Sequence, residues 1–128
     1  MYCFMVMNMG SEKQFENQIK EYLKKMNCWY VKTWSNGIQR EGIPDLIICV
    51  NGFFLGVEVK AKNGRPTELQ KWNVKKIKEA GGIAIILYPD QFDQFKELIY
   101  LLKLGFHNNA QRAQNILFEG SNAAKEGD

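Results

Sequence analysis

Asp45, Glu58 and Lys60 are charged residues that stand beside two apolar runs in the middle of the chain. Asp45 directly precedes the first run, and Glu58 and Lys60 stand at the end of the second. Asn51-Gly52 separates the runs, and this dipeptide is the strongest short-range signal for a β-hairpin. A two-residue turn there places Asp45 directly opposite Glu58, with Cβ atoms about 4.5–5.5 Å apart.

Two carboxylates that face each other in this way destabilise a hairpin, because like charges in opposed positions repel. A divalent cation between them is the simplest explanation, since Mg²⁺ is typically held by one or two carboxylates together with water and phosphate. Side chains alternate along a strand, so Lys60 shares a sheet face with Glu58 and can hold an attacking water or offset transition-state charge. The alternative is that Lys60 only forms a structural salt bridge, and a bulge in the hairpin would shift the pairing.

The apolar runs themselves predict the centre of an α/β fold with a mixed sheet. Residues 46–50 and 53–59 are apolar on both faces, which is typical of strands in a sheet covered on each side. Thr67 is a good helix N-cap, and Gly81-Gly82 ends that helix before a buried strand at 83–87. This strand–helix–strand order predicts parallel strands with a right-handed crossover. The inner face of the helix is predicted to consist of Leu69, Trp72, Ile77 and Ala80.

Two further helices and one strand are predicted around this unit. Ser11 opens the first helix, and Gln14 completes a capping-box pattern. Residues 28–34 are aromatic and β-branched and read as a strand, residues 35–42 as a loop, and residues 91–104 as the last helix. The buried residues are predicted to be Phe15, Ile19, Tyr22, Leu23 and Met26 in the first helix and Phe92, Phe95, Leu98, Ile99 and Leu102 in the last.

The ends of the chain are less informative. A chain of 128 residues suits a single domain, which we expect to span residues 1–119. Ile116 to Phe118 could anchor a short piece, and residues 120–128 are predicted to be a disordered tail. Residues 1–9 are apolar but make a poor signal peptide, and an edge strand, a dimer contact or an over-long start are the alternatives.

Charge points to a phosphate-rich partner. Seven basic residues and one acidic residue, Glu68, lie between positions 60 and 78, a local charge of +6 in a chain whose net charge is +3. Such a stretch is the electrostatic footprint expected for a nucleic-acid backbone, although a solvated helix face is an equal alternative from charge alone.

Several classes of function are excluded by composition. The only histidine, His107, lies in a polar region and is expected in an exposed loop, which removes histidine-based catalysis and His-rich zinc sites. The sequence has no phosphate-binding P-loop, so we expect no nucleotide cofactor, and no apolar run long enough to span a membrane. Cys3, Cys28 and Cys49 have no C-x-x-C spacing and are expected to be reduced thiols in the cytoplasm, with Cys49 inside a strand.

Taken together, these motifs resemble a known family. Gly42-Ile43-Pro44-Asp45 followed by Glu58-Val59-Lys60 resembles the PD-(D/E)XK nuclease superfamily. The continuation from Lys62 to Trp72 and the opening Ser11-Glu12-Lys13 with Glu16 resemble the small VRR-NUC domains of phage and bacteria. The resemblance covers about residues 11–87 and implies a restriction-endonuclease-like core.

The resemblance also implies roles for individual residues. Asp45 and Glu58 would be metal ligands together with the backbone carbonyl of Val59, and Lys60 would be the catalytic lysine. Glu16 would reach the metal directly or through water, with Glu12 as its rival, although an ion pair of Glu16 with Lys20 is a serious alternative. Gln70 matches the family's glutamine, but Thr67 and Gln70 also form a capping-box pattern, and both roles can hold together. Trp72 is expected in the core.

The implied chemistry is metal-assisted hydrolysis of a DNA phosphodiester that leaves 5′-phosphate and 3′-hydroxyl ends. Mg²⁺ would be the cofactor, and Mn²⁺ would substitute for it. The residues expected to contact the DNA backbone are Arg40, Lys62, Arg65, Lys71 and Lys75; Lys32 and Ser35 are further, weaker candidates on the strand and loop before Asp45.

Two classes of function follow. The first is a structure-selective endonuclease that acts on four-way junctions, as a homodimer that matches a two-fold symmetric substrate. The second is a non-catalytic DNA-binding module on the same fold; a flap, single-strand or RNA nuclease also remains open. The apolar N-terminus and the helix at 91–104 are the predicted dimer surfaces.

Overall fold

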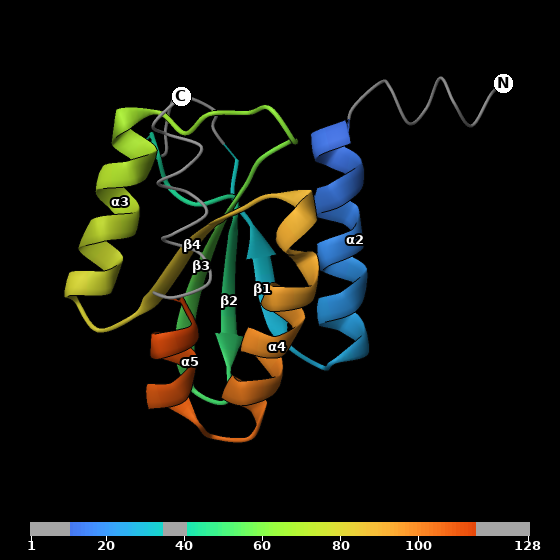
Figure 1. The fold of residues 1–128 in the computed structure, drawn as a ribbon, viewed down its shortest axis with the longest axis vertical. Coiled ribbons are helices and arrows are strands. Elements are labelled where there is room, and N and C mark those ends of the chain that lie inside the picture. Colours follow the sequence, from blue (N-terminus) through green and yellow to red (C-terminus); the bar gives the residue numbers. More distant parts are fainter. Residues whose placement is uncertain (1–10, 35–40, 115–128) are drawn as a thin grey trace, which may run out of the picture.

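The computed structural model describes residues 11–34 and 41–114 of the chain, which form helices on both faces of one sheet (Figure 1). This confirms the predicted α/β fold with a mixed, four-stranded sheet flanked by helices. The elements are α2 (Ser11–Lys25), β1 (Trp29–Lys32), β2 (Leu46–Val50), β3 (Phe53–Val59), α3 (Glu68–Glu79), β4 (Ile83–Leu87), a 3₁₀ turn (Pro89–Gln91), α4 (Phe92–Lys103) and α5 (His107–Ala113).

The sheet has the strand order β1-β2-β3-β4. β2 pairs antiparallel with both β1 and β3, whereas β3 and β4 run parallel, as the strand–helix–strand order predicted. Val50 pairs with Phe53 and Leu46 with Val57, so the hairpin contains no bulge. Asn51 and Gly52 both have positive φ, 50° and 83°, which is the backbone that a tight two-residue hairpin turn requires.

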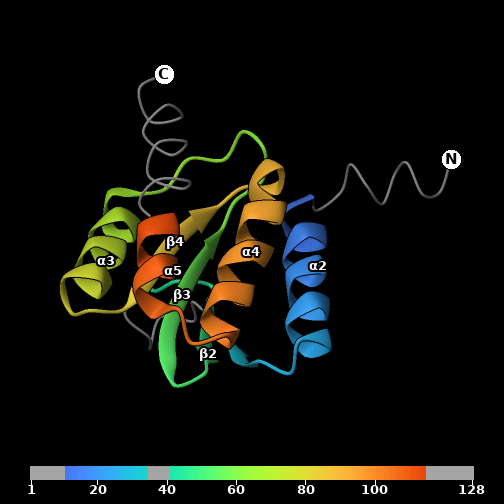
Figure 2. The ribbon, with the colours of Figure 1, turned by 60° about the horizontal axis from the view of Figure 1, so that its bottom comes forward.

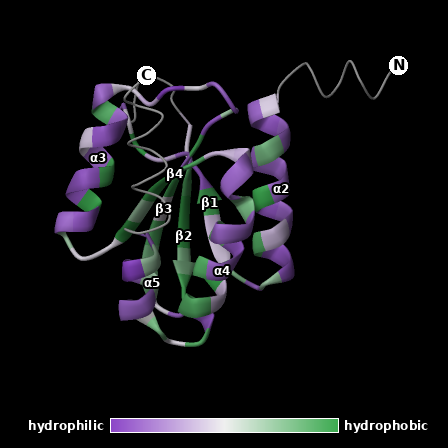
Figure 3. Cartoon of the chain, viewed as in Figure 1, coloured by the Kyte–Doolittle hydropathy of each residue, from purple (hydrophilic) through white to green (hydrophobic). Residues whose placement is uncertain are grey.

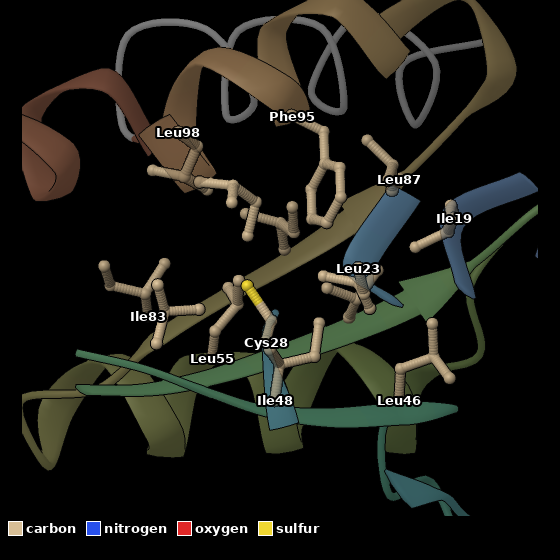
Figure 4. Packing of buried hydrophobic residues seen from close by; sticks show 14 of the residues in the cluster. Ile19, Leu23, Cys28, Leu46, Ile48, Leu55, Ile83, Leu87, Phe95 and Leu98 are labelled. Atoms are coloured by element: carbon tan, nitrogen blue, oxygen red, sulfur yellow. The ribbon is translucent and has the colours of Figure 1, made fainter. Parts of the chain in front are cut away.

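The main core lies between the sheet and the layer formed by α2, α4 and α5 (Figure 2). Alternate residues of every strand point into it, and Figure 4 shows Leu46, Ile48 and Leu55 from the hairpin meeting Ile19 and Phe95 from the two long helices. These apolar side chains are almost fully buried. Their removal from water is the main contribution to the stability of the fold.

The opposite face of the sheet is covered over only part of its width. α3 packs on β3 and β4, where Val74 and Ile77 meet Ala84, Ile86 and Tyr88. The described residues do not cover the outer face of β2 fully: Ile47 is half-buried and Cys49 is exposed. The prediction that both hairpin strands are buried on both faces is therefore right for the later part of β3, wrong at its start, where Phe54 is 43% exposed, and wrong for β2.

Of the four residues predicted for the inner face of α3, only Ile77 packs against the sheet. Leu69, Trp72 and Ala80 are exposed, Trp72 to 46%, and Lys76 Nζ lies 5.6 Å from the centre of the Trp72 ring. Val74 and Ile77 face the sheet, and the buried amide of Asn73 donates to Leu69 O within the helix at 3.0 Å and to Glu41 O at 3.5 Å. The hydropathy colouring shows how hydrophilic α3 is beside the apolar strands (Figure 3).

α5, the last helix of the described chain, was not predicted from the sequence. The apolar side of α4 was predicted correctly, because Phe95, Leu98, Ile99 and Leu102 are all fully buried. Because these side chains lie in the protein's own core, they are not available for a dimer contact, and the dimer role of this helix stays a prediction. His107 is the first residue of α5, so the prediction that it lies in a loop is wrong.

Several predictions fall outside the described residues, including the N-terminal segment, the piece at 116–118 and the tail at 120–128. Among the residues that the structure describes, no helix is long and apolar enough to cross a membrane. Cys28, which is buried, and Cys49 both carry free thiols, and Cys49 lies in a strand as predicted.

Candidate active site

Asp45 and Glu58 meet at one end of the sheet, where β2 begins and β1, β3 and β4 end. The register that pairs Leu46 with Val57 brings Asp45, one residue before β2, opposite Glu58. Asp45 is held there because its Oδ2 atom accepts a hydrogen bond of 2.9 Å from Val59 N–H. The hairpin thus brings the two carboxylates together as the sequence predicted.

Glu58 is only 3% exposed, which is unusual for a carboxylate. Its Oε1 atom accepts a hydrogen bond, but no donor in the described part of the chain reaches its buried Oε2 atom. Burial, followed by the negative charge of Asp45, raises the pKa of Glu58 from 4.5 to about 8. The closeness of the two carboxyl groups adds to this shift, because they can share a hydrogen bond only when one of them holds a proton.

Lys60 lies on the same side of the sheet as Glu58, as alternation along the strand predicted. Its Nζ atom is 3.9 Å from Glu58 Oε1, and the lysine side chain is 13% exposed. This is a loose ion pair, longer than a charge-assisted hydrogen bond. The positive charge of Lys60 opposes the increase in the pKa of Glu58 without cancelling it.

Gln70 joins the first turn of α3 to this site. Its backbone N–H donates to Thr67 Oγ1 at 3.1 Å, and its Oε1 atom accepts from Thr67 N–H at 2.8 Å, which completes the predicted capping box. Its Nε2 atom donates to Glu58 Oε1 at 2.8 Å. The helix cap and the contact with the site therefore hold together.

Glu16 reaches the site from α2, where it is 8% exposed. Its Oε2 atom lies 3.1 Å from Lys20 Nζ, so the predicted alternative, an ion pair with Lys20, is present. Its Oε1 atom lies 2.6 Å from Lys32 Nζ. Burial disfavours the charged form of Glu16, but the hydrogen bonds from Lys32 and Lys20 outweigh burial and lower its pKa.

Lys32, which the sequence suggested only as a weak candidate for DNA contact, belongs to the charge network of the site. It is the last residue of β1, and its Nζ atom lies between Glu16 Oε1 at 2.6 Å and Asp45 Oδ1 at 3.5 Å. Burial works against its charge, but the hydrogen bond to Glu16 prevails and raises the pKa of Lys32. The available signal was the antiparallel pairing of β1 with β2, which sets Lys32 beside Leu46 and so next to Asp45.

Glu12, the rival of Glu16, is exposed and lies one turn earlier on α2. Its pKa is raised by burial and then by the charge of Asp45. Glu12 therefore lies at the rim of the site, close enough for the charge of Asp45 to affect its pKa. Glu16 belongs to the side-chain network of the site, because it pairs with Lys20 and Lys32.

Asp45 and Glu58 are the carboxylates of the site that could hold a divalent cation. In the described ranges, no three Asp, Glu, Cys or His side chains are arranged to hold a metal by themselves. Mg²⁺ needs only one or two carboxylates, because water and substrate phosphate supply its other ligands. The buried Glu58 Oε2 atom, which meets no donor among the described residues, fits this requirement. The role of the Val59 carbonyl stays a prediction.

The residues predicted to contact DNA follow the site along the chain. Lys62 and Arg65 are exposed in the turn between β3 and α3, and Lys75 is exposed on α3. Lys71 is partly buried, and its Nζ atom lies 3.1 Å from Glu68 Oε1. Arg40 lies outside the described residues.

Replacing Thr67 with alanine tests the junction between helix cap and site. The change removes the hydroxyl that caps Gln70 N–H and is expected to lower the free energy of unfolding by about 1 kcal/mol. Urea denaturation measures this loss, and Thr67→Ser, which keeps the hydroxyl, is the matched control. Equal loss in both variants would contradict the capping role.

Comparison of the chain with models of known families, with characterised proteins and with solved structures found no match.

Proposed function

We propose that this protein is a metal-dependent endonuclease that hydrolyses DNA phosphodiester bonds, in keeping with the resemblance of its motifs to VRR-NUC nucleases. One observation carries the proposal. Glu58 is buried opposite Asp45, with an oxygen that no described donor reaches, and Lys60 stands beside it. A buried carboxylate with a raised pKa beside a second carboxylate is costly to the fold, and perturbed groups such as Glu58 concentrate at functional sites.

Each of these residues has a distinct task in the proposal. Asp45 and Glu58 hold the cation, and Gln70 fixes the orientation of Glu58 by donating to its Oε1 atom. Lys60 orients the attacking water and offsets negative charge that develops on the phosphate. A divalent cation bound there would acidify a water and neutralise charge on the scissile phosphate. Mg²⁺ suits two carboxylates with few protein ligands, and Mn²⁺ would substitute.

The DNA would lie against the basic segment that follows Lys60. Lys62, Arg65 and Lys75 are exposed there and can contact the phosphate backbone. Such contacts position a nucleic acid without reading its sequence, so selectivity would come from the shape of the DNA. A four-way junction is the substrate we propose, in a bacterial or phage-infected cytoplasm.

A homodimer would match the two-fold symmetry of such a junction. The uncovered sheet face offers a surface for it, because the register sets Trp29, Cys49 and Phe54 side by side on three strands. The Trp29 and Phe54 side chains are 63% and 43% exposed. Exposed apolar side chains that gather on one face are typical of protein interfaces.

A cleavage assay on defined DNA substrates tests the function. Purified protein is incubated with labelled four-way junction, flap, duplex and single-stranded DNA, in Mg²⁺, in Mn²⁺ and in EDTA. We expect cutting in either metal and none in EDTA, with paired symmetric nicks on the junction. Light scattering on the same sample is expected to give the molar mass of a dimer.

Asp45→Asn, purified in the same way, is the matched control. Asparagine keeps an oxygen for the hydrogen bond from Val59 N–H but loses the charge that would hold the cation. Loss of cutting in this variant excludes a contaminating nuclease. If the protein is a monomer and cuts flaps or single strands, its function is that of a flap or single-strand nuclease and not that of a junction resolvase. DNA binding without cutting in either metal would overturn the proposal in favour of the non-catalytic module.

A further inference from the structure

Lys32 is placed where a cation would be expected. Its ammonium group lies between Glu16 Oε1 at 2.6 Å and Asp45 Oδ1 at 3.5 Å. The lysine side chain is 22% exposed, so the contact is partly shielded from solvent and is stronger than an ion pair on the open surface. β1 holds Lys32 in this position through its pairing with Leu46, the residue after Asp45.

The other oxygens of these two carboxylates are also engaged. Glu16 Oε2 is 3.1 Å from Lys20 Nζ, and Asp45 Oδ2 accepts from Val59 N–H at 2.9 Å. Glu16 therefore has one lysine on each oxygen, and its negative charge is neutralised without a metal, whereas Asp45 has one lysine at 3.5 Å and one neutral backbone amide. Glu58 differs, because its Oε2 atom meets no donor among the described residues.

Two-metal nucleases hold two cations about 3.5–4 Å apart, on either side of the scissile phosphate. Here Asp45 faces Glu58 on one side and Lys32 on the other. We propose that Lys32 fills the second cation position, so that this protein binds one divalent ion between Asp45 and Glu58, and that Glu16 positions Lys32 and is not a metal ligand. The inference rests on the proposed metal site and gives its stoichiometry.

In this assignment Lys32 supplies a fixed positive charge, and Glu16 is the residue that positions it. A second divalent ion would need to displace an ammonium that is held at 2.6 Å by a buried carboxylate. The fixed charge of Lys32 replaces one that a second ion would bring to the phosphate. Because this charge belongs to the chain, it is present before metal or DNA arrives.

Mn²⁺ binding to Lys32→Ala tests the proposal without reference to activity. Wild type is expected to bind one Mn²⁺ in a calorimetric titration. Lys32→Ala frees Glu16 Oε1 and Asp45 Oδ1, so it is expected to bind two, with the first about tenfold more tightly because a nearby positive charge is gone. Lys24→Ala is the control, since Lys24 is an exposed lysine on α2 that pairs only loosely with Glu21 at 3.5 Å.

Glu16→Gln gives an independent answer if Lys32→Ala fails to fold. In the proposal Glu16 acts only through Lys32. The Glu16→Gln substitution should therefore weaken Mn²⁺ binding by no more than about tenfold, which is the lower end of the loss expected when a residue next to the metal ligands is changed. Asp45→Asn should abolish binding. A loss in Glu16→Gln as large as in Asp45→Asn would overturn the proposal.

The outcomes separate this inference from the proposed function. One ion in the wild type and two in Lys32→Ala support it. The same number of ions in both proteins, or two ions in the wild type, overturns it and leaves the nuclease intact. If neither protein binds Mn²⁺, the metal site fails, and the proposed function and the inference are both overturned.

Discussion

Replacing Lys60 with methionine is expected to slow metal-dependent cleavage by about a hundredfold to a thousandfold, the usual cost of removing one group that stabilises transition-state charge. Methionine keeps the length of the side chain and removes the ammonium, which lies 3.9 Å from Glu58 Oε1. Lys60 forms no closer ion pair with Asp45 or Glu58, so a purely structural salt bridge explains its position poorly.

The measurement is single-turnover cleavage at saturating Mg²⁺, with Mn²⁺ binding followed in parallel. We expect the rate to fall while one Mn²⁺ still binds, because the ligands Asp45 and Glu58 are unchanged. Lys103→Met, at the exposed end of α4, serves as the control for the loss of one lysine. If Lys60→Met cleaves at the wild-type rate, the catalytic role of Lys60 is wrong, even if the protein is a nuclease.

Much of this site could be predicted because its central part is local in sequence. Asn51-Gly52 specifies a two-residue turn, and the turn fixes the register of two strands whose apolar residues fill the core. Counting outward from the turn then places Asp45 opposite Glu58. The capping box of Gln70 with Thr67 was found in the same way, because it lies within four residues, whereas the place of Gln70 in the site came from the family resemblance.

Contacts between distant segments were not predictable in this way. Lys32 meets Glu16 and Asp45 only because α2 and β1 pack beside the hairpin, and no spacing along the chain records that packing. Lysine on a strand end is ordinarily a solvent-facing residue, and we interpreted Lys32 only as a weak candidate for DNA contact. The charge network of the site was therefore only partly visible in the sequence.

The errors in the helices have a similar cause. The apolar residues of α3 suggested an inner face with Leu69 and Trp72, but the face toward the sheet carries Val74 and the buried polar Asn73, and Gln70 reaches Glu58 from the first turn. Hydrophobic periodicity does not anticipate polar side chains that are buried for a specific partner. α5 was not predicted because its seven residues, from His107 to Ala113, carry almost no apolar pattern.

Glu58→Gln is expected to make the metal-free protein more stable, although it removes a residue that the proposed reaction needs. The folded protein raises the pKa of Glu58 from 4.5 to about 8, so the native state holds this proton more tightly than the unfolded chain does. Stability from this group is then fully present below about pH 4.5 and is lost as the pH rises toward 8.

The size of the effect follows from the same shift. Each pH unit within this window costs at most about 1.4 kcal/mol, so the charged form of Glu58 destabilises the metal-free fold by a few kcal/mol at its upper end. Glutamine keeps the oxygen that accepts from Gln70 Nε2 and can place its amide toward Asp45. We therefore expect the variant to be more stable than wild type by about 2–4 kcal/mol at pH 8, with little difference at pH 4.5.

Urea denaturation in EDTA across this pH range measures both proteins, and Glu97→Gln on the exposed side of α4 is the control. Parallel pH profiles for wild type and Glu58→Gln would show that folding does not raise the pKa of Glu58. Saturating Mg²⁺ should then stabilise wild type and leave Glu58→Gln unchanged, because a ligand stabilises only the fold that binds it. A carboxylate that weakens the empty fold and strengthens the loaded one is retained for binding and not for folding, which is the trade-off expected of an active site.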